Sequence, residues 1–208
     1  MITNPTTFPH TSTLWLPRFE ALFSETVAAA RSAIGGIFFG HLHSDSFRLI
    51  RGDDGVAAVA MLAPSVTPWV NGWAQADPQA IPNNPAVRQL EVSSVGGPRQ
   101  RWAVSAYRQY MTNLTADNDG DRIVWTEEYA SKSGLGLGDT SAAAYTALWQ
   151  SLRVNVSRFD AYYKWNKVSF PPVACDAACR AGQICATGYT AASDIAACLR
   201  QNANGERG

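Results

Sequence analysis

The sequence predicts an α/β (α+β) fold in which a small sheet with helical cover precedes a helical, cysteine-rich C-terminal part. Residues 17–30 carry apolar side chains at spacings of three and four, with a proline at the start, which is typical of an amphipathic helix. Short β-branched and aromatic runs at 37–39, 47–50 and 56–62 indicate strands. From Asp139 onward, helix-capping residues and an apolar stripe indicate a helical last third.

Composition limits the class of protein. With 208 residues, of which 46% are hydrophobic and 16% charged, the chain is long enough to bury a sizeable core. The 17 basic residues balance the 17 acidic ones, so the charge does not indicate binding to nucleic acid or to an anionic membrane. The longest apolar stretch, residues 55–64, is too short to span a bilayer, and no transmembrane segment is predicted.

Two histidines, His41 and His43, follow the first predicted strand directly after Gly40. Side chains two residues apart on an extended chain point to the same side, so both imidazoles are expected to face one small volume. Neutral imidazole is the commonest side-chain metal ligand, and the pair is therefore a candidate metal site. The alternative is a pair of solvent-exposed histidines on a hairpin. His10 is expected to be a solvated histidine.

The segment after the histidines contains a turn and a long loop. Residues 51–55 have the composition of a hairpin turn. Residues 64–85 form a long Pro- and Asn-rich segment, and loops of this length are often functional. Trp69 and Trp73 in this loop are expected either to line a substrate site or to cover the core from outside.

Further elements are expected toward the C-terminus. Residues 87–92 and 102–110 have the pattern of two strands, joined by the turn at 96–98. Residues 117–121 are expected to form a polar turn, and residues 125–133 a short helix. Residues 139–141 offer candidate N-caps for one long helix that ends at Pro171 and Pro172. Its apolar stripe is Tyr145, Leu148, Trp149, Leu152, Phe159 and Tyr163.

The four cysteines lie within the last 34 residues, at positions 175, 179, 185 and 198. Their even number and tight clustering favour two disulfides and an oxidising compartment, although a zinc knot that uses all four is an alternative. Residues 1–6 lack the features of an export signal, so we expect that the present start is not the original one. Asn113 and Asn155 begin glycosylation sequons, which have meaning in a eukaryotic secretory pathway.

Several motifs resemble one family. The run FFGHLHSDSF at 38–47 is similar to the F-F-G-H-T-H-x-D-x-F motif of the acid sphingomyelinase branch of the calcineurin-like metallophosphoesterases. LAPSVT at 62–67 resembles the L-A-P-S-x-T segment that follows in that family, and NPAVR at 84–88 stands where the family has N-P-G-Y-R, with Val87 in place of the aromatic residue. Asn113-Leu114-Thr115 and the cysteine spacing also match, so the resemblance covers residues 34–199.

The resemblance implies a fold and a domain organisation. Residues 1–115 would be the C-terminal part of a metallophosphoesterase sheet-and-helix sandwich, and residues 116–208 a helical C-terminal subdomain with two disulfides. It also implies that Cys175 pairs with Cys179 and that Cys185 pairs with Cys198.

The resemblance further implies phosphodiester hydrolysis at a site with two zinc ions. His43 would bind the first ion and His41 the second, and no catalytic residue is assigned. The family motifs D-x-H, G-D-x-x-D and G-N-H-E do not occur in the sequence. We therefore expect that an upstream part of the domain is missing and that the chain alone is inactive and binds zinc weakly. The substrate would be a phosphodiester, including lipids, and the location secreted or lysosome-like.

Two other functions are consistent with the residues. One is a cupin-type enzyme with a single metal ion held by His41, His43 and Asp45, although the later Glu and His of a cupin are not found. The other is a non-catalytic extracellular binding module. The number of zinc ions per chain distinguishes them: two for the phosphodiesterase, one for the cupin-type enzyme and none for the binding module.

Overall fold

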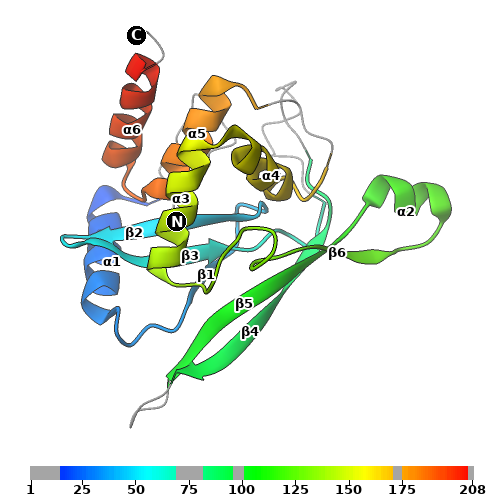
Figure 1. Ribbon diagram of the computed structural model, residues 1–208, viewed down its shortest axis with the longest axis horizontal. Coiled ribbons are helices and arrows are strands. Elements are labelled where there is room, and N and C mark those ends of the chain that lie inside the picture. The colour runs from blue at the N-terminus through cyan, green and yellow to red at the C-terminus, as the bar shows by residue number, and fades with distance from the viewer. Residues whose placement is uncertain (1–14, 69–81, 96–100, 171–174, 206–208) are drawn as a thin grey trace.

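The computed structural model describes residues 15–68, 82–95, 101–170 and 175–205. These residues form two three-stranded sheets with helices packed around them (Figure 1), which confirms the predicted α/β class. The first sheet has the order β1 (Ile37–Phe39), β3 (Gly55–Leu62), β2 (Ser46–Gly52). Strand β1 is parallel to β3, and β2 is antiparallel to β3 through the predicted hairpin turn.

The first sheet lies between helices because its side chains alternate between two apolar faces. On one face, Ile50 and Ala60 pack against Val27 of helix α1 (Pro17–Ala30). On the other face, Phe47, Leu49, Val59 and Met61 pack against helices α3 (Ala142–Val154) and α5 (Ala177–Gly188). Burying each of these side chains other than Ala60 contributes about 1.5–3 kcal/mol, so burial on both faces holds the C-terminal helices on a sheet built from residues 37–62.

The second sheet is antiparallel, in the order β4 (Ala86–Val95), β5 (Arg101–Thr112), β6 (Trp125–Ala130). Strands β4 and β5 form a long ribbon that extends away from the rest of the molecule (Figure 1). The two strands predicted at 87–92 and 102–110 are confirmed, and the turn predicted at 96–98 lies outside the described residues.

The helix predicted at 125–133 is wrong, because residues 125–130 are strand β6. The two glutamates at 127 and 128 favoured a helix locally, but Trp125, Thr126 and Tyr129 are good strand formers. Pairing with β5, which sets Thr126 opposite Met111 and Tyr129 opposite Gln109, decides the conformation. The ladder also buries Tyr129, which a short surface helix would have exposed.

The polar turn predicted at 117–121 is instead the end of a short helix, α2 (Leu114–Gly120). The Asn113 side chain caps its first turn by accepting a hydrogen bond from the Ala116 N–H. Asp121 ends the helix in a left-handed conformation, with φ 51°. Asp117 is buried and accepts hydrogen bonds from the Thr112 hydroxyl and the Val124 N–H, so its carboxylate joins α2 to the end of β5 and to the residue before β6.

The single long helix predicted after Ser141 is two helices, α3 and α4 (Val156–Asn166). Of the three predicted candidates at 139–141, Ser141 is the N-cap of α3, with its hydroxyl accepting from the Ala144 N–H at 3.2 Å. Asn155 interrupts the helix because its side chain caps α4, accepting from the Arg158 N–H at 2.9 Å. The prolines expected to end the helix lie outside the described residues, and α4 ends earlier, before Lys167.

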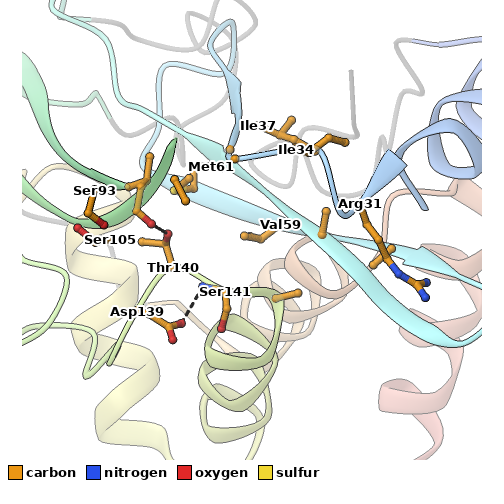
Figure 2. Close-up of a pocket in the computed structure, with 17 residues that line it drawn as sticks. Arg31, Ile34, Ile37, Val59, Met61, Ser93, Ser105, Asp139, Thr140 and Ser141 are labelled. Atoms are coloured by element: carbon orange, nitrogen blue, oxygen red, sulfur yellow. Dashed lines mark hydrogen bonds between the residues drawn. The ribbon is translucent and has the colours of Figure 1, made fainter. Parts of the chain in front are cut away.

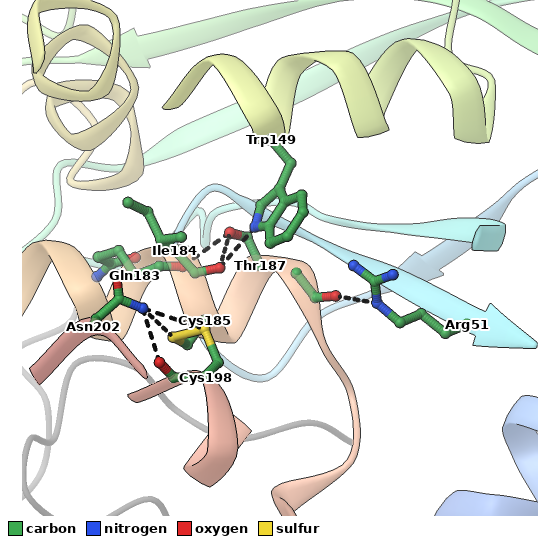
Figure 3. Close-up of a disulfide and its surroundings, with 9 residues drawn as sticks. Arg51, Trp149, Gln183, Ile184, Cys185, Thr187, Cys198 and Asn202 are labelled. Atoms are coloured by element: carbon green, nitrogen blue, oxygen red, sulfur yellow. Dashed lines mark hydrogen bonds between the residues drawn. A yellow bond between two sulfur atoms is a disulfide. The ribbon is translucent and has the colours of Figure 1, made fainter. Parts of the chain in front are cut away.

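The C-terminal helices α5 and α6 (Ala192–Gly205) carry the two disulfides. Cys175 is joined to Cys179 and Cys185 to Cys198, which is the pairing that the resemblance implies. The second disulfide links α5 to α6 next to the side chain of Asn202 (Figure 3). Among the described residues no helix has both the length and the apolarity to cross a membrane. The division at residues 115 and 116 stays a prediction.

Candidate metal-binding site at the histidine loop

The two histidines lie in the loop of residues 40–45 between β1 and β2, here called the histidine loop. Strands β1 and β3 are parallel, so their carboxyl ends meet at one edge of the sheet. The chain that leaves β3 contacts the loop there: the Ala63 N–H donates to the Phe39 carbonyl at 3.3 Å and the Ser65 N–H to the His43 carbonyl at 3.4 Å. This edge is where α/β sheets usually bind ligands.

The histidines are not on extended chain, and this expectation was wrong. His41 has φ 72° and His43 has φ 58°, both in the left-handed region. The Leu42 N–H donates to the Gly40 carbonyl at 2.9 Å, so His41 sits at the centre of a γ-turn in its rarer, positive-φ form. A tight turn, and not a pleated strand, therefore sets how the two imidazoles are presented. His41 is exposed and His43 is half-buried.

Asn83 fixes the second half of the loop. Its side-chain amide donates to the His43 carbonyl at 2.7 Å and to the Ser44 hydroxyl at 3.2 Å. Asn83 is buried in the segment before β4, so these bonds are shielded from water. The loop is thus tied to a segment forty residues further along the chain.

Asp45 is held inside the protein. Its carboxylate accepts a hydrogen bond from Arg88 Nη2 at 2.5 Å and another from the Tyr129 hydroxyl, and only 8% of its side chain is exposed. The Asp45 carbonyl accepts from the Asn166 side chain at 2.6 Å. The cupin-type alternative needed Asp45 as a third metal ligand, but here the carboxylate is committed to a buried ion pair with Arg88.

Arg88 connects the loop to the second sheet. Nη2 also donates to the Gln109 Oε1 atom at 2.6 Å, and its guanidinium lies 4.2 Å from the centre of the Tyr107 ring. Burial and the Asp45 carboxylate raise the pKa of Tyr129 well above its usual value, so its hydroxyl remains a donor to Asp45. The Tyr129 ring stacks on Trp165 at 4.6 Å between centroids.

The sequence alone did not indicate the supporting role of these residues. Asn83, Arg88, Gln109, Tyr129 and Asn166 come from five separated segments, and only the fold brings them together. Arg88 and Gln109 each lie in a predicted strand. A polar side chain that is buried in a strand needs a hydrogen-bond partner, so the sequence indicated that these two residues would be paired.

The donor set of the histidine loop fits part of a zinc site. Two imidazoles suit Zn²⁺, which typically takes four ligands of the nitrogen, sulfur or carboxylate type. Within the described ranges, no cluster of three or more histidine, cysteine, aspartate or glutamate side chains is placed to hold a metal ion. His41 and His43 can therefore supply two ligands, and the remaining ones would have to come from elsewhere.

A separate hollow of about 500 Å³ lies away from the histidines (Figure 2). It is bordered by the residues that follow α1, by β3 and β5, and by the start of α3, with Ile34, Ile37 and Met61 on its wall and Arg31 at one side. The polar groups of the α3 start are already used: the Thr140 hydroxyl donates to the Val104 carbonyl at 2.5 Å, and Asp139 accepts from the Ser141 N–H. Neither His41 nor His43 lines it.

The sequence of residues 58–205 matches a family described as the acid sphingomyelin phosphodiesterase C-terminal region. This match covers well over half of the 208 residues. The chain belongs to this family. The strands β4–β6 and helices α2–α6 all lie within the matched residues, together with both disulfides. The histidine loop lies before the match begins, so the match does not test its role.

The chain is similar to several curated proteins and covers only part of the length of each. The chain is 32% identical to the human acid sphingomyelinase-like phosphodiesterase 3b over 81% of its own length and 36% of the relative's. It is 27% identical to the sphingomyelinase phosphodiesterase C of Dictyostelium discoideum and 29% identical to the human cyclic GMP-AMP phosphodiesterase. These two matches cover 77% and 81% of the chain, and each covers 36% of the relative. The chain thus spans about a third of the length of the relatives that it matches.

The remaining residues named in the sequence predictions are two sequon asparagines, one histidine and two tryptophans. Asn113 and Asn155 are exposed helix caps. His10, Trp69 and Trp73 lie outside the described residues.

Proposed function

We propose that this chain is the C-terminal portion of a two-zinc phosphodiesterase, in which His43 binds the first zinc ion and His41 the second. The observation that carries the proposal is the position of the two histidines. They project from a tight turn at the carboxyl edge of a parallel strand pair, in a chain of the acid sphingomyelin phosphodiesterase family. The chain by itself is proposed to be inactive, because each zinc ion needs more ligands than one imidazole.

When bound, a pair of zinc ions supplies an activated water and neutralises the phosphoryl oxygens of a phosphodiester. The residues of this chain contribute the two imidazoles and the rigid loop that carries them. The substrate class we propose is a phosphodiester. Relatives are named as phosphodiesterases of sphingomyelin and of cyclic GMP-AMP, and both of these compounds contain such a bond.

We also propose a secreted or lysosome-like location, with glycans on Asn113 and Asn155. Two disulfides support an oxidising compartment. At both asparagines the side-chain oxygen accepts the capping hydrogen bond. The amide nitrogen, to which a glycan is attached, is not used by the cap, so capping and glycosylation are compatible.

The zinc role is tested with the isolated chain. A titration with Zn²⁺ alone, followed by the imidazole ¹⁵N resonances, is expected to shift the signals of both His41 and His43. His41→Ala and His43→Ala should each leave the shift of the other imidazole in place, because the two side chains are proposed to bind different zinc ions. Loss of both shifts in either variant would indicate one shared ion and contradict the proposal. The matched control is His10→Ala, the third histidine of the sequence, which should leave the titration unchanged.

Activity is tested in a chimera in which this chain replaces the corresponding C-terminal portion of the human acid sphingomyelinase-like phosphodiesterase 3b. We expect hydrolysis of bis(4-nitrophenyl) phosphate by the chimera, none by the isolated chain, and loss of chimera activity with His41→Ala or His43→Ala. A chimera that keeps its full activity after both substitutions contradicts the proposed zinc ligands. Hydrolysis by the isolated chain contradicts the proposed need for an upstream portion.

A further inference from the structure

The histidine loop has a backbone that is unfavourable by itself. Left-handed φ values at two non-glycine residues, His41 and His43, each cost about 1–2 kcal/mol relative to ordinary conformations. Such conformations persist only where the surrounding structure imposes them. The residues that impose this conformation thereby also determine where the two imidazoles lie.

Three contacts, all made with His43 or Asp45, impose it. The Asn83 amide holds the His43 carbonyl at 2.7 Å, and the Asn166 amide holds the Asp45 carbonyl at 2.6 Å. Between these two carbonyls, the Asp45 carboxylate is anchored by Arg88 at 2.5 Å, with 4% of the Arg88 side chain exposed. Hydrogen bonds therefore fix the backbone on both sides of Ser44, at His43 and at Asp45.

Arg88 is itself held from several directions. Gln109 accepts from its Nη2 atom at 2.6 Å, the Leu62 carbonyl accepts from Nη1 at 3.4 Å, and Tyr107 packs against its guanidinium. Leu62 is the last residue of β3, the strand parallel to β1. The ion pair thus ties the histidine loop to both sheets, and Asp45 cannot turn toward a metal ion without leaving Arg88 buried and unpaired.

We infer that Asn83 and the Asp45–Arg88 pair are positioning residues that hold His41 and His43 in their metal-binding arrangement, and that Asp45 is not itself a ligand. This inference rests on the proposed zinc role of the histidines. It assigns a function to Asp45, whose place two residues after His43 made it a candidate ligand.

The first test is Asn83→Ala, measured with Zn²⁺ alone as the probe. We expect the affinity at His41 and His43 to fall at least about tenfold, which is typical when a residue that orients metal ligands is removed. The control is Asn202→Ala, which also removes an amide that donates to a backbone carbonyl, that of Cys198 at 2.9 Å, far from the loop on α6. It should leave the affinity within about twofold.

Backbone ¹⁵N relaxation of the same variants distinguishes positioning from general stability. In Asn83→Ala, increased mobility should be confined to residues 40–45 and their contacts. An Asn83→Ala variant that keeps wild-type zinc affinity, or whose changes extend through the whole molecule, overturns the positioning role. A wild-type chain that binds no zinc at the histidines overturns the proposed function, and this inference with it.

The second test is Arg88→Met, which releases the Asp45 carboxylate. If Asp45 positions the loop, zinc affinity falls, because the loop loses its anchor. If Asp45 were a ligand held back by Arg88, zinc affinity would rise, and that result overturns the inference. Should Arg88→Met fail to fold, Asn83→Ala still tests whether side-chain contacts position the loop.

Discussion

The charge of one half-buried carboxyl group, that of Glu128, depends on pH near neutrality. Glu128 on β6 accepts hydrogen bonds from Gln109 Nε2 at 2.8 Å and from the Ser169 hydroxyl at 2.7 Å. Burial is the main cause that raises its pKa from 4.5 to about 7, and the Asp45 carboxylate adds to the effect. The two hydrogen bonds and Lys164 oppose the rise but do not cancel it.

The raised pKa of Glu128 makes the free energy of unfolding depend on pH. Between pH 4.5 and about 7 the folded chain keeps a proton on Glu128 that the unfolded chain has lost. The free energy of unfolding should therefore fall as pH rises through this window and level off above it. In Glu128→Gln, the decrease in the free energy of unfolding over this pH window should be smaller by on the order of 1–3 kcal/mol. Urea denaturation at a series of pH values measures it.

The neighbouring glutamate provides the control. Glu127 is exposed and pairs with Arg108 at the surface at 2.9 Å, so Glu127→Gln should keep the wild-type slope. Glu20, whose pKa is also raised by burial, accounts for a residual slope in every variant. An unchanged slope in Glu128→Gln would show that this carboxyl does not carry the pH dependence.

Among the helices, the contact between α3 and α5 depends on one glycine. The Trp149 indole donates to the Ile184 carbonyl at 2.9 Å, and Arg51 Nε from β2 donates to the Gly188 carbonyl at 2.9 Å (Figure 3). A Cβ atom at Gly188 would lie 2.5 Å from the Trp149 indole, closer than real side chains allow. The close approach of α5 to α3 therefore requires glycine at this position.

Gly188→Ala is expected to lower the free energy of unfolding by about 1–3 kcal/mol, because the indole must move from a packed position. Gly138→Ala is the matched control, since no atom lies within 4 Å of the added Cβ there. That variant should change stability by no more than about 0.5 kcal/mol. Chemical denaturation measures both, and equal values for the two variants would contradict the role of the Trp149 contact.

At the scale of the whole molecule, the last described helix, α6, is connected both to α5 and to the first described helix, α1. Helix α6 is linked to α5 through the disulfide Cys185–Cys198, and the Ala192 N–H at its start hydrogen-bonds Glu20 of α1. Cys185 is fully buried, and Cys198 nearly so. The disulfide Cys175–Cys179, by contrast, spans only four residues at the start of α5.

Removal of the two disulfides should therefore have unequal effects. In the chain-entropy description, Cys185→Ala with Cys198→Ala costs about 3 kcal/mol and Cys175→Ala with Cys179→Ala about 2 kcal/mol, since the first loop is longer. The buried position of Cys185 adds a packing loss to the first pair. Urea denaturation of the two double variants measures the difference, and a larger loss for the 175–179 pair would contradict this account.

Local patterns in the sequence were sufficient for much of the fold. Helix α1, strands β1 to β5 and a helix cap within residues 139–141 were all predicted, because each depends on side chains within a few residues of one another. The family resemblance also placed the histidine motif and implied the cysteine pairing. These features carry their signal in spacing and residue type.

Only the tertiary structure decided the rest. Strand β6 replaces a predicted helix because β5 offers it a ladder, and Asn155 divides the expected long helix by capping its second half. The left-handed histidines and the burial of Asp45 depend on Asn83, Arg88 and Tyr129, which lie 40, 43 and 84 residues in sequence from the loop residues that they contact. Their hydrogen bonds and ion pair form only when distant segments meet, so no local pattern could reveal how the candidate site is held.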